Sequence, residues 1–352
     1  MVVRSKWQSL PTEAINPSSL GIDKLAADEL VDLMLNEDRK VLAAVQRERE
    51  RIAVGVEMIA AALRRGGRVV FVGAGTSGRL GILESAEMPP TFSTDPSLVQ
   101  AVMAGGRDAI FGTKEGVEDN YEEGARAMTR FHPTKPDVVI GVSASGMTPF
   151  VRGALTRARK AGSRIIFVTC DPGTELQTFV DLTIAPGVGA EIIAGSTRLK
   201  AGTATKLVLN ALTTGAMVLI GKTYGNLMVD VQTGSEKLKD RARRIVNIVT
   251  GLDYEDADRL LTKAHWNVKA AIVMQKTGLP LGKAQSRLRK AHDSMREAIG
   301  EDIEPRLRGM LQGHAEAVVD HAPTSSATAA RTRRVPRTPI TRPPTVKPSG
   351  PP

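Results

Sequence analysis

The chain contains a single cysteine, Cys170, among its 352 residues. One cysteine excludes an intramolecular disulfide bond, and such sparse use of cysteine is typical of a reducing compartment. Long apolar runs are also missing, because no window approaches the ~20 apolar residues of a membrane span. The N-terminus lacks the apolar core of a secretion signal. These absences predict a cytoplasmic protein that does not act on a membrane.

Histidine is scarce as well, and no histidine stands at metal-ligand spacing from the cysteine or from an acidic cluster. The five histidines are His132, His265, His292, His314 and His321. No arrangement of serine, histidine and aspartate recommends a catalytic triad either. We therefore predict no bound metal and look to carboxylates and hydroxyls for the chemistry.

Acidic residues are absent from the end of the chain, although the net charge is +10 and the pI is near 9.8. From residue 323 onward there are six basic residues: Arg331, Arg333, Arg334, Arg337, Arg342 and Lys347. Without these six the net charge falls from +10 to +4, an ordinary value for an enzyme that handles anions. The tail is rich in proline, threonine and arginine and has no interleaved aromatic residues. We expect it to be disordered from about residue 322, and we expect no nucleic-acid partner.

Short apolar runs alternate with helical patterns through the middle of the chain. Strands are predicted at residues 69–72, 98–103, 138–142, 165–169 and 182–185. Continuous apolar strands that alternate with helices indicate an α/β fold with a parallel sheet covered on both faces. The predicted regions are an N-terminal arm with helices (1–58), the α/β domain (59–222), a C-terminal helical region (223–300) and a basic tail (301–352).

Several helices have predicted boundaries that a structure can check. Residues 28–63 are predicted to be helical, with a break near residues 36–40, and residues 12–23 form an irregular arm before them. A long helix is predicted over 196–220, with Ser196 or Thr197 as its N-cap. Shorter helices are predicted within 253–277 and 281–299.

A glycine-rich loop at residues 73–78 follows the first predicted strand and opens a helix. Its glycines allow a tight turn, and the helix N-terminus favours a phosphate. The spacing Gly73, Gly75, Gly78 also matches a dinucleotide fingerprint, but the acidic residue that such a site needs does not end the next strand, because Asp95 precedes it. A tight turn without any ligand is the other alternative.

A second loop at residues 141–146 repeats this arrangement after the third strand. When Gly73 is aligned with Gly141, Ser77 meets Ser145 and Gly78 meets Gly146. Two such loops at the carboxyl ends of parallel strands favour a shared site for one sugar phosphate. Neither loop carries the lysine of a P-loop, so nucleotide hydrolysis is not expected.

Carboxylates are the remaining candidates for acid–base chemistry. Pro89 and Pro90 are expected to end the first helix, which leaves Glu87 in its last turn, where the helix dipole favours the protonated form that a general acid needs. Glu84 competes for this role. A second group is predicted on the helix after the loop at 104–106: Glu115, Glu118, Asp119, Glu122 and Glu123. The sequence pattern alone does not select one of them.

These motifs together resemble the N-acetylmuramic acid 6-phosphate etherases, which have the sugar isomerase (SIS) fold and are related to glucokinase regulatory protein. The resemblance extends over residues 12–299. The matching stretches are residues 73–92, 104–106, 115–119, 143–146, 172–173, 189–206 and 225–231. It implies a five-stranded SIS-type sheet, a small C-terminal bundle of the ubiquitin-associated type, and a homodimer.

The resemblance also implies roles for individual residues. It makes Glu87 the catalytic acid and Glu118 the base in cleavage of the C3 lactyl ether, which yields N-acetylglucosamine 6-phosphate and D-lactate without a cofactor. The implied substrate-binding residues are Gly75, Thr76, Ser77, Gly78, Ser143, Ser145, Glu191 and Lys200. The activity would belong to cell-wall sugar recycling.

Three positions depart from the family pattern, namely Met88 (often Cys), Ser93 (usually Gly) and Ser235 (usually Asn). The first two flank Glu87, so they put substrate preference in question rather than activity. Two other functions stay open at this point. A non-catalytic sugar-phosphate regulator would need the loops but neither glutamate, and an aldose–ketose isomerase of the same fold would release no lactate.

Overall fold

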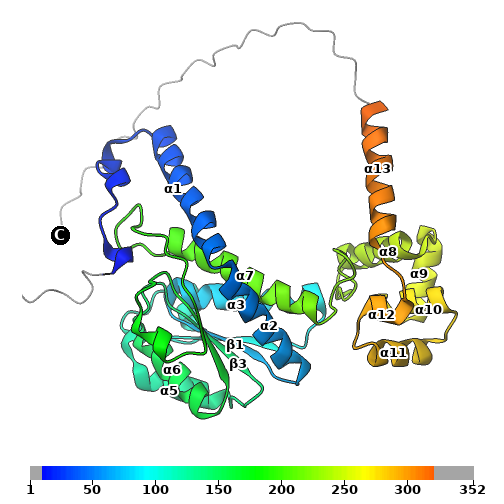
Figure 1. The fold of residues 1–352 in the computed structure, drawn as a ribbon, viewed down its shortest axis with the longest axis horizontal. Coiled ribbons are helices and arrows are strands. Elements are labelled where there is room, and N and C mark those ends of the chain that lie inside the picture. Colours follow the sequence, from blue (N-terminus) through cyan, green and yellow to red (C-terminus); the bar gives the residue numbers. More distant parts are fainter. Residues whose placement is uncertain (1–9, 321–352) are drawn as a thin grey trace, which may run out of the picture. The chain divides into compact units, whose positions relative to one another are not determined.

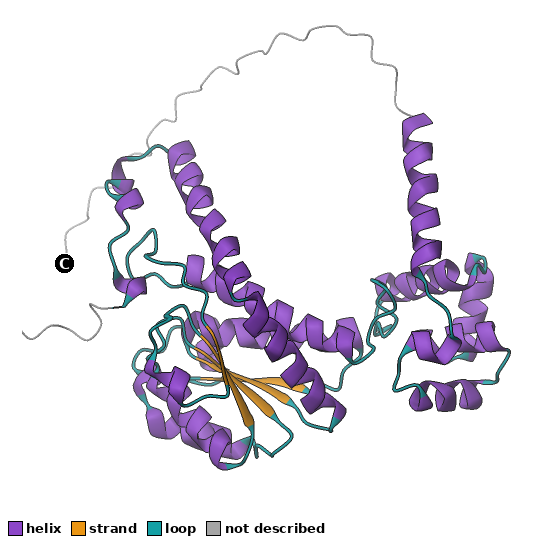
Figure 2. Cartoon of the chain, in the orientation of Figure 1, coloured by secondary structure: helices purple, strands orange, loops and turns teal. Residues whose placement is uncertain are grey.

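The computed structural model describes residues 10–320, and side chains as far as residue 312. The tail expected to be disordered lies outside these residues. Five parallel strands form one sheet in the order β2-β1-β3-β4-β5 (Figures 1 and 2). They are β1 (Val69–Gly73), β2 (Val99–Met103), β3 (Val138–Val142), β4 (Arg164–Val168) and β5 (Leu182–Ile184). Every predicted strand is confirmed, with ends that differ by at most one residue.

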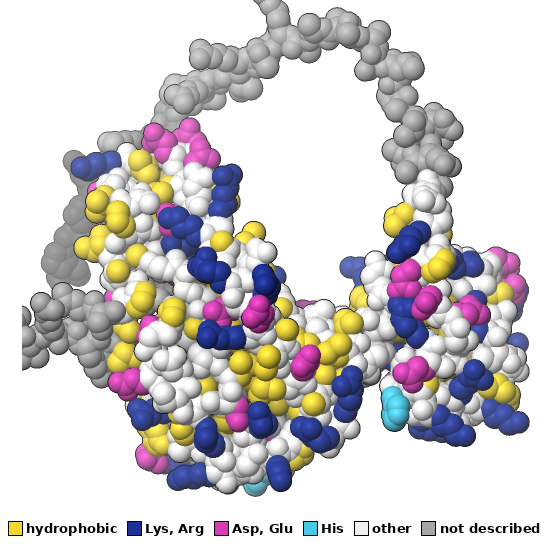
Figure 3. All heavy atoms as spheres, viewed as in Figure 1, with side chains coloured by type: hydrophobic (Ala, Val, Ile, Leu, Met, Phe, Trp, Pro, Cys, Tyr) yellow, Lys and Arg dark blue, Asp and Glu magenta, His cyan; other side chains and the backbone are white. Residues whose placement is uncertain are grey.

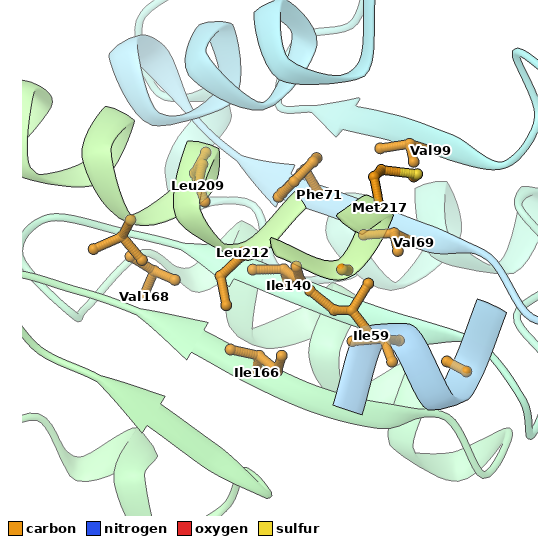
Figure 4. Packing of buried hydrophobic residues seen from close by; sticks show 14 of the residues in the cluster. Ile59, Val69, Phe71, Val99, Ile140, Ile166, Val168, Leu209, Leu212 and Met217 are labelled. Atoms are coloured by element: carbon orange, nitrogen blue, oxygen red, sulfur yellow. The ribbon is translucent and has the colours of Figure 1, made fainter. Parts of the chain in front are cut away.

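Helices cover both faces of the sheet, as the continuous apolar strands predict. On one face, Phe71, Ile140 and Ile166 pack against residues of α2 (Arg49–Arg64), α3 (Gly75–Phe92) and α7 (Lys200–Leu219). Figure 4 shows this cluster, with Leu212 of α7 beside the strands. On the other face, Val70 and Val139 pack against α5 (Tyr121–Arg130) and α6 (Pro149–Lys160).

The strand order places a topological switch point between β1 and β3. The chain leaves β1 for β2 on one side and later returns to β3 on the other side. Helix α3, which follows β1, and helix α6, which follows β3, therefore cover opposite faces of the sheet. In open α/β sheets of this order, ligands bind in the crevice outside the carboxyl ends of these two strands.

The N-terminal helices are α1 (Ala27–Arg47) and α2, and the break between them falls at Glu48. The prediction of a break near residues 36–40 is wrong. That polar stretch stays helical because Glu37 is buried in an ion pair with Lys200 of α7. The preceding arm is irregular, as predicted, with single 3-10 turns at η1 (Pro11–Glu13), η2 (Pro17–Ser19) and η3 (Ile22–Lys24).

Helix α3 runs through Pro89 and Pro90 and ends at Phe92, so the prediction that the prolines end it is wrong. Two prolines remove two backbone donors, which normally destabilises a helix. Here Phe92 and Met88 are buried in the core and hold the last turn in place. Ser93 closes the helix in the left-handed region, with φ 46°, and donates its N–H to the Pro89 carbonyl at 2.9 Å.

Helix α7 begins at Lys200, so the expected N-caps Ser196 and Thr197 do not cap it. The Glu191 carboxylate caps it instead, accepting the backbone N–H groups of Lys200 at 3.0 Å and Ala201 at 2.9 Å. A capping group that lies outside the helix in sequence leaves no local signal.

The C-terminal region is helical, as predicted. It comprises α8 (Glu236–Thr250), α9 (Tyr254–Lys263), α10 (Val268–Thr277), α11 (Leu281–Lys290), α12 (Met295–Ile299) and α13 (Glu304–Asp320). The expected helices within 253–277 and 281–299 are confirmed as α9 to α12, whereas α8 and α13 were not predicted. Short turns complete the chain: α4 (Asp108–Phe111), η4 (Val117–Asp119) and η5 (Glu175–Thr178). Within the described residues, no helix is both long and apolar enough to cross a membrane.

Candidate functional site

The first loop makes a very close turn from β1 into α3. A Cβ atom on Gly73 would lie 2.6 Å from the Gly78 nitrogen, and one on Gly78 would lie 2.9 Å from the Gly73 oxygen. Only glycine permits this approach, so the first turn of α3 lies directly on the end of β1. Gly75 has a φ of +53°, and a Cβ atom there would meet nothing within 4 Å. The outer side of the loop is therefore open to a ligand.

Thr76 and Ser77 stand in the first turn of α3 and are half-buried. No side-chain hydrogen bond of either hydroxyl occurs within the described part of the chain. The Thr76 methyl group lies 3.6 Å from the Cβ position of Gly202, which places the first turn of α7 beside the loop. The N-terminal end of α3 and two hydroxyls thus point to an anion site of the kind the sequence predicts.

The second loop lies next to the first, because β1 and β3 pair in register, with Gly73 opposite Val142. Its conformation is fixed from within: the buried Ser143 hydroxyl is 2.7 Å from the Thr148 hydroxyl. Ser145 accepts the Met147 N–H at 3.4 Å and is half-buried. The structure therefore brings Ser77 and Ser145 to the same edge of the sheet at the switch point.

Glu87 and its competitor Glu84 have different environments. Glu84 is buried and accepts hydrogen bonds from Asn210 and Thr213 of α7, so its carboxylate ties α3 to α7. Glu87 is exposed, and no hydrogen bond or ion pair of its carboxylate occurs among residues 10–312. It lies three helical turns, about 16 Å, beyond Thr76 and on the same side of α3.

Glu118 lies in the 3-10 turn η4 and is exposed. The prediction that Glu115 to Glu123 share one helix is wrong, because α5 begins only at Tyr121 and Asn120 caps it. Turn η4 packs against α6. The start of α5 lies so close to α6 that a Cβ atom on Gly153, in the second turn of α6, would meet the Tyr121 oxygen at 2.0 Å. Glu118 therefore lies on the α6 side of the crevice, near the end of the second loop.

Glu191 and Lys200 belong to a buried polar network between the N-terminal arm, α1 and α7. The Lys200 ammonium donates at 2.8 Å to Oε2 of Glu37, which also accepts from Asn16 at 3.0 Å, and Lys40 donates to the other oxygen, Oε1, at 2.5 Å. Burial raises the pKa of Glu37, but the hydrogen bonds from Lys200, Lys40 and Asn16 outweigh it and lower this pKa to about 2. Burial raises the pKa of Glu191 in spite of its two backbone donors. The charged atoms of both residues are thus engaged within the protein.

A cavity of about 740 Å³ lies along the edge strand β2, between α3 and α5. Its wall includes Val117 and Asn120, the neighbours of Glu118, together with Gly105 and Gly106. Among the residues that the structure describes, no group of three or more His, Cys, Asp or Glu side chains is arranged to hold a metal ion.

Comparison with known proteins identifies the family. Over 291 residues the chain is 50% identical to an N-acetylmuramic acid 6-phosphate etherase of Trichormus variabilis, covering 82% of this chain and 94% of that protein. It is 46% identical over 297 residues to the etherase of Microcystis aeruginosa (84% and 97%) and 48% identical over 296 residues to that of Salinibacter ruber (84% and 95%).

The chain belongs to the N-acetylmuramic acid 6-phosphate etherase family. The resemblance predicted from its motifs is therefore confirmed. Residues 51–159 also match the family described as the glucokinase regulatory protein N-terminal SIS domain, and the predicted five-stranded SIS fold is confirmed. The residues that sequence reasoning missed are Asn16 and Glu37 of the N-terminal region, whose partners are distant in the chain, and Arg79, which stands inside the first motif.

Proposed function

We propose that this protein is an N-acetylmuramic acid 6-phosphate etherase, a carbon–oxygen lyase of cell-wall sugar recycling. The observation that carries this proposal is that nearly half of the aligned residues are identical to those of N-acetylmuramic acid 6-phosphate etherases, over almost the full length of those proteins. Two serine-bearing loops at the switch point fit a sugar-phosphate substrate, and two exposed glutamates, Glu87 and Glu118, are available for acid–base chemistry. The lone, buried thiol of Cys170 agrees with a cytoplasmic location.

The phosphate would bind at the first turn of α3. Backbone N–H groups near Gly75, the hydroxyls of Thr76 and Ser77 and the helix dipole all favour a dianion there, and the lack of a side chain at Gly75 and Gly78 permits a close approach. The Ser145 hydroxyl of the second loop is half-buried and adjacent. Ser143 already bonds to Thr148, so we assign it the role of holding the loop in shape as well as contacting the sugar.

The reaction needs one carboxylate and one carboxylic acid and no cofactor. In the open-chain aldehyde the C2 proton is acidic, and Glu118 would remove it as base. The C2–H electron pair forms a C2=C3 double bond, the C3–O bond to lactate breaks, and Glu87 donates a proton to the departing oxygen. Water then adds across the double bond, which restores a hydroxyl at C3 and leaves N-acetylglucosamine 6-phosphate and D-lactate.

A homodimer would complete this site. Glu87 stands about 16 Å along α3 from Thr76, too far along a straight helix to serve its own phosphate loop easily. Large apolar side chains are exposed in a stripe on α1 at Val31, Leu35 and Leu42, and Leu83 is exposed one turn before Glu87. Hydrophobic side chains reach the surface of the part that carries α1 and α2 (Figure 3). We infer that a second copy covers these residues and brings its Glu87 to the first loop.

The test is incubation of the purified protein with N-acetylmuramic acid 6-phosphate and an enzymatic assay for D-lactate. Wild-type protein should release D-lactate, whereas Glu87→Gln and Glu118→Gln should each lose at least about a hundredfold in rate, the usual range for a general acid or base. Glu122→Gln, an exposed acid in the first turn of α5, is the matched control and should stay active. Binding without lactate would indicate a regulator, and a ketose phosphate would indicate an isomerase.

A further inference from the structure

Arg79 holds the segment that leads to Glu118. Its Nε donates to the Ile110 carbonyl at 2.8 Å, and its Nη2 donates to the carbonyls of Ala109 at 2.9 Å and Gly112 at 3.1 Å. These three carbonyls belong to the last residues of α4 and its C-cap. A helix end has carbonyls without partners inside the helix, and a side chain that donates to them fixes where the helix ends.

Helix α4 needs such support because it has only four residues. One turn of helix does not persist on its own, since nucleation costs more than its few hydrogen bonds return. The other polar tie within this segment is the bridge from Lys114 to Asp108 at 2.9 Å, which is exposed and therefore contributes little. The three hydrogen bonds of Arg79 are thus the main polar connection between α4 and the rest of the domain in the part of the chain that the structure describes.

The position of α4 is transmitted to Glu118 through Gly105. A Cβ atom on Gly105 would lie 2.9 Å from the Ala109 side chain and 3.4 Å from the side chains of both Lys114 and Val117. Residues 109, 114 and 117 therefore pack around one glycine, which has a φ of +79°. Val117 directly precedes Glu118, so a shift of α4 reaches the backbone of Glu118 within a few residues.

The part of α3 that carries Arg79 is held firmly in the domain. Arg79 follows Gly78, whose close contact with Gly73 fixes the first turn of α3 to β1. One turn further along, the Glu84 carboxylate ties the same helix to α7. An arginine suits this role because its planar guanidinium presents several donors on separate nitrogens in fixed directions, whereas the donors of a lysine all stand on one nitrogen at the end of a flexible stem.

On this geometry, and resting on the proposed function, we propose that Arg79 is a positioning residue for the base Glu118. It makes no direct contact with substrate in this assignment. It sets the distance between the Glu118 carboxylate and the C2 proton by fixing α4 against α3. Misplacement of a catalytic group by about 1 Å costs up to a hundredfold in rate.

The experiment compares Arg79→Lys and Arg79→Gln with Asp108→Asn, a control that breaks only the exposed bridge to Lys114 in the same segment. We expect the arginine variants to lower kcat for D-lactate release by about ten- to a hundredfold, with a much smaller change in KM. Because removal of the C2 proton becomes slower, the kinetic isotope effect with substrate deuterated at C2 should rise. Asp108→Asn should change neither quantity.

A second measurement separates positioning from general damage. In a Glu118→Asp background, which keeps a misplaced carboxylate, Arg79→Lys should add little further loss, so the two changes are not additive. Amide hydrogen exchange of residues 109–118 should also increase in Arg79→Lys, whether or not lactate is formed. Full additivity, an unchanged isotope effect or unchanged exchange would overturn the assignment. Absence of lactate from wild-type protein would instead refute the proposed function.

Discussion

Replacing Lys200 by methionine tests whether this residue is structural or binds substrate. The resemblance to the family suggests substrate binding, but the ammonium is buried and lies 2.8 Å from Glu37. The variant leaves the Glu37 carboxylate buried with only Asn16 and the half-exposed Lys40 as partners. Removing one partner of a buried ion pair costs about 3–5 kcal/mol. We therefore expect Lys200→Met to destabilise the fold rather than to weaken substrate binding alone.

The expected loss of stability in Lys200→Met can be expressed as a change in Tm and compared with the pKa of Glu37. For a domain of this size about 1 kcal/mol changes Tm by 2–4 °C, so Lys200→Met should lower Tm by about 10 °C. The pKa of Glu37 is lowered from 4.5 to about 2, although burial by itself raises it, because Lys200, Lys40 and Asn16 stabilise the charged form. A shift of this size corresponds to about 3 kcal/mol of stability from the ionised carboxylate, shared among its three donors, of which the exposed Lys40 contributes least because solvent screens its charge.

The pH dependence has a definite sign. A carboxylate whose folded pKa is depressed stabilises the fold above its unfolded pKa, here 4.5, and loses this contribution as the pH falls toward 2. Thermal unfolding of wild type and Lys200→Met should therefore differ most at neutral pH, and the two Tm values should converge as the pH falls through this window.

The controls decide between the two roles. Lys206→Met removes an exposed lysine from the same helix and should leave Tm unchanged. The double variant Glu37→Met/Lys200→Met should recover most of the lost stability, because no buried charge remains without a partner. If Lys200→Met instead keeps the wild-type Tm and raises KM for the sugar phosphate, the structural role is refuted and Lys200 is a substrate ligand.

Two further predictions concern the loops and the dimer. The inactive variants Glu87→Gln and Ser77→Ala can be mixed, dissociated and allowed to reassociate. If each site takes these two residues from different subunits, D-lactate release should return to about one quarter of the wild-type rate, because half of the dimers are mixed and each mixed dimer has one intact site. No recovery would place both residues of a site in one chain. Gly146→Ala should destabilise the fold by about 1–3 kcal/mol in thermal unfolding, because its φ is +74° and the added Cβ would lie 2.8 Å from the Thr174 hydroxyl; an unchanged Tm would contradict the tight packing of this loop.

The sheet could be predicted from sequence because its strands are marked locally. Runs such as Val69–Gly73 and Val138–Val142 are apolar throughout and are bounded by glycine and polar residues. Burial on both faces requires that pattern, so the strands need no information from distant residues. The same applies to the two loops, since glycine and serine follow each strand directly and the parallel order brings them to one edge.

Three of the wrong boundaries share one physical cause, which is a partner distant in sequence. The polar residues 36–40 predict a loop, but they are helical because Lys200 forms a buried ion pair with Glu37. Ser196 is predicted to cap α7, but the Glu191 carboxylate accepts the N–H groups at the start of this helix instead. Pro89 and Pro90 are predicted to end α3, but the helix continues to Phe92 because the burial of this side chain holds the last turn in place. Tertiary contacts override local preference in each case, and a single sequence does not record which residues meet.

Helix α3 carries four separate features of the proposed site and its support. Its first turn carries the proposed phosphate site, Arg79 holds the segment before Glu118, Glu84 ties the helix to α7, and Glu87, the proposed acid, stands near its end. Since the helix continues through the prolines to Phe92, Glu87 is held inside a regular helix and not in a frayed last turn. The distance from the proposed phosphate site to the proposed acid is therefore fixed by the helical rise, at about 16 Å. A fixed spacing of this length favours an acid that acts across a subunit interface, because α3 cannot shorten to bring Glu87 to its own loop.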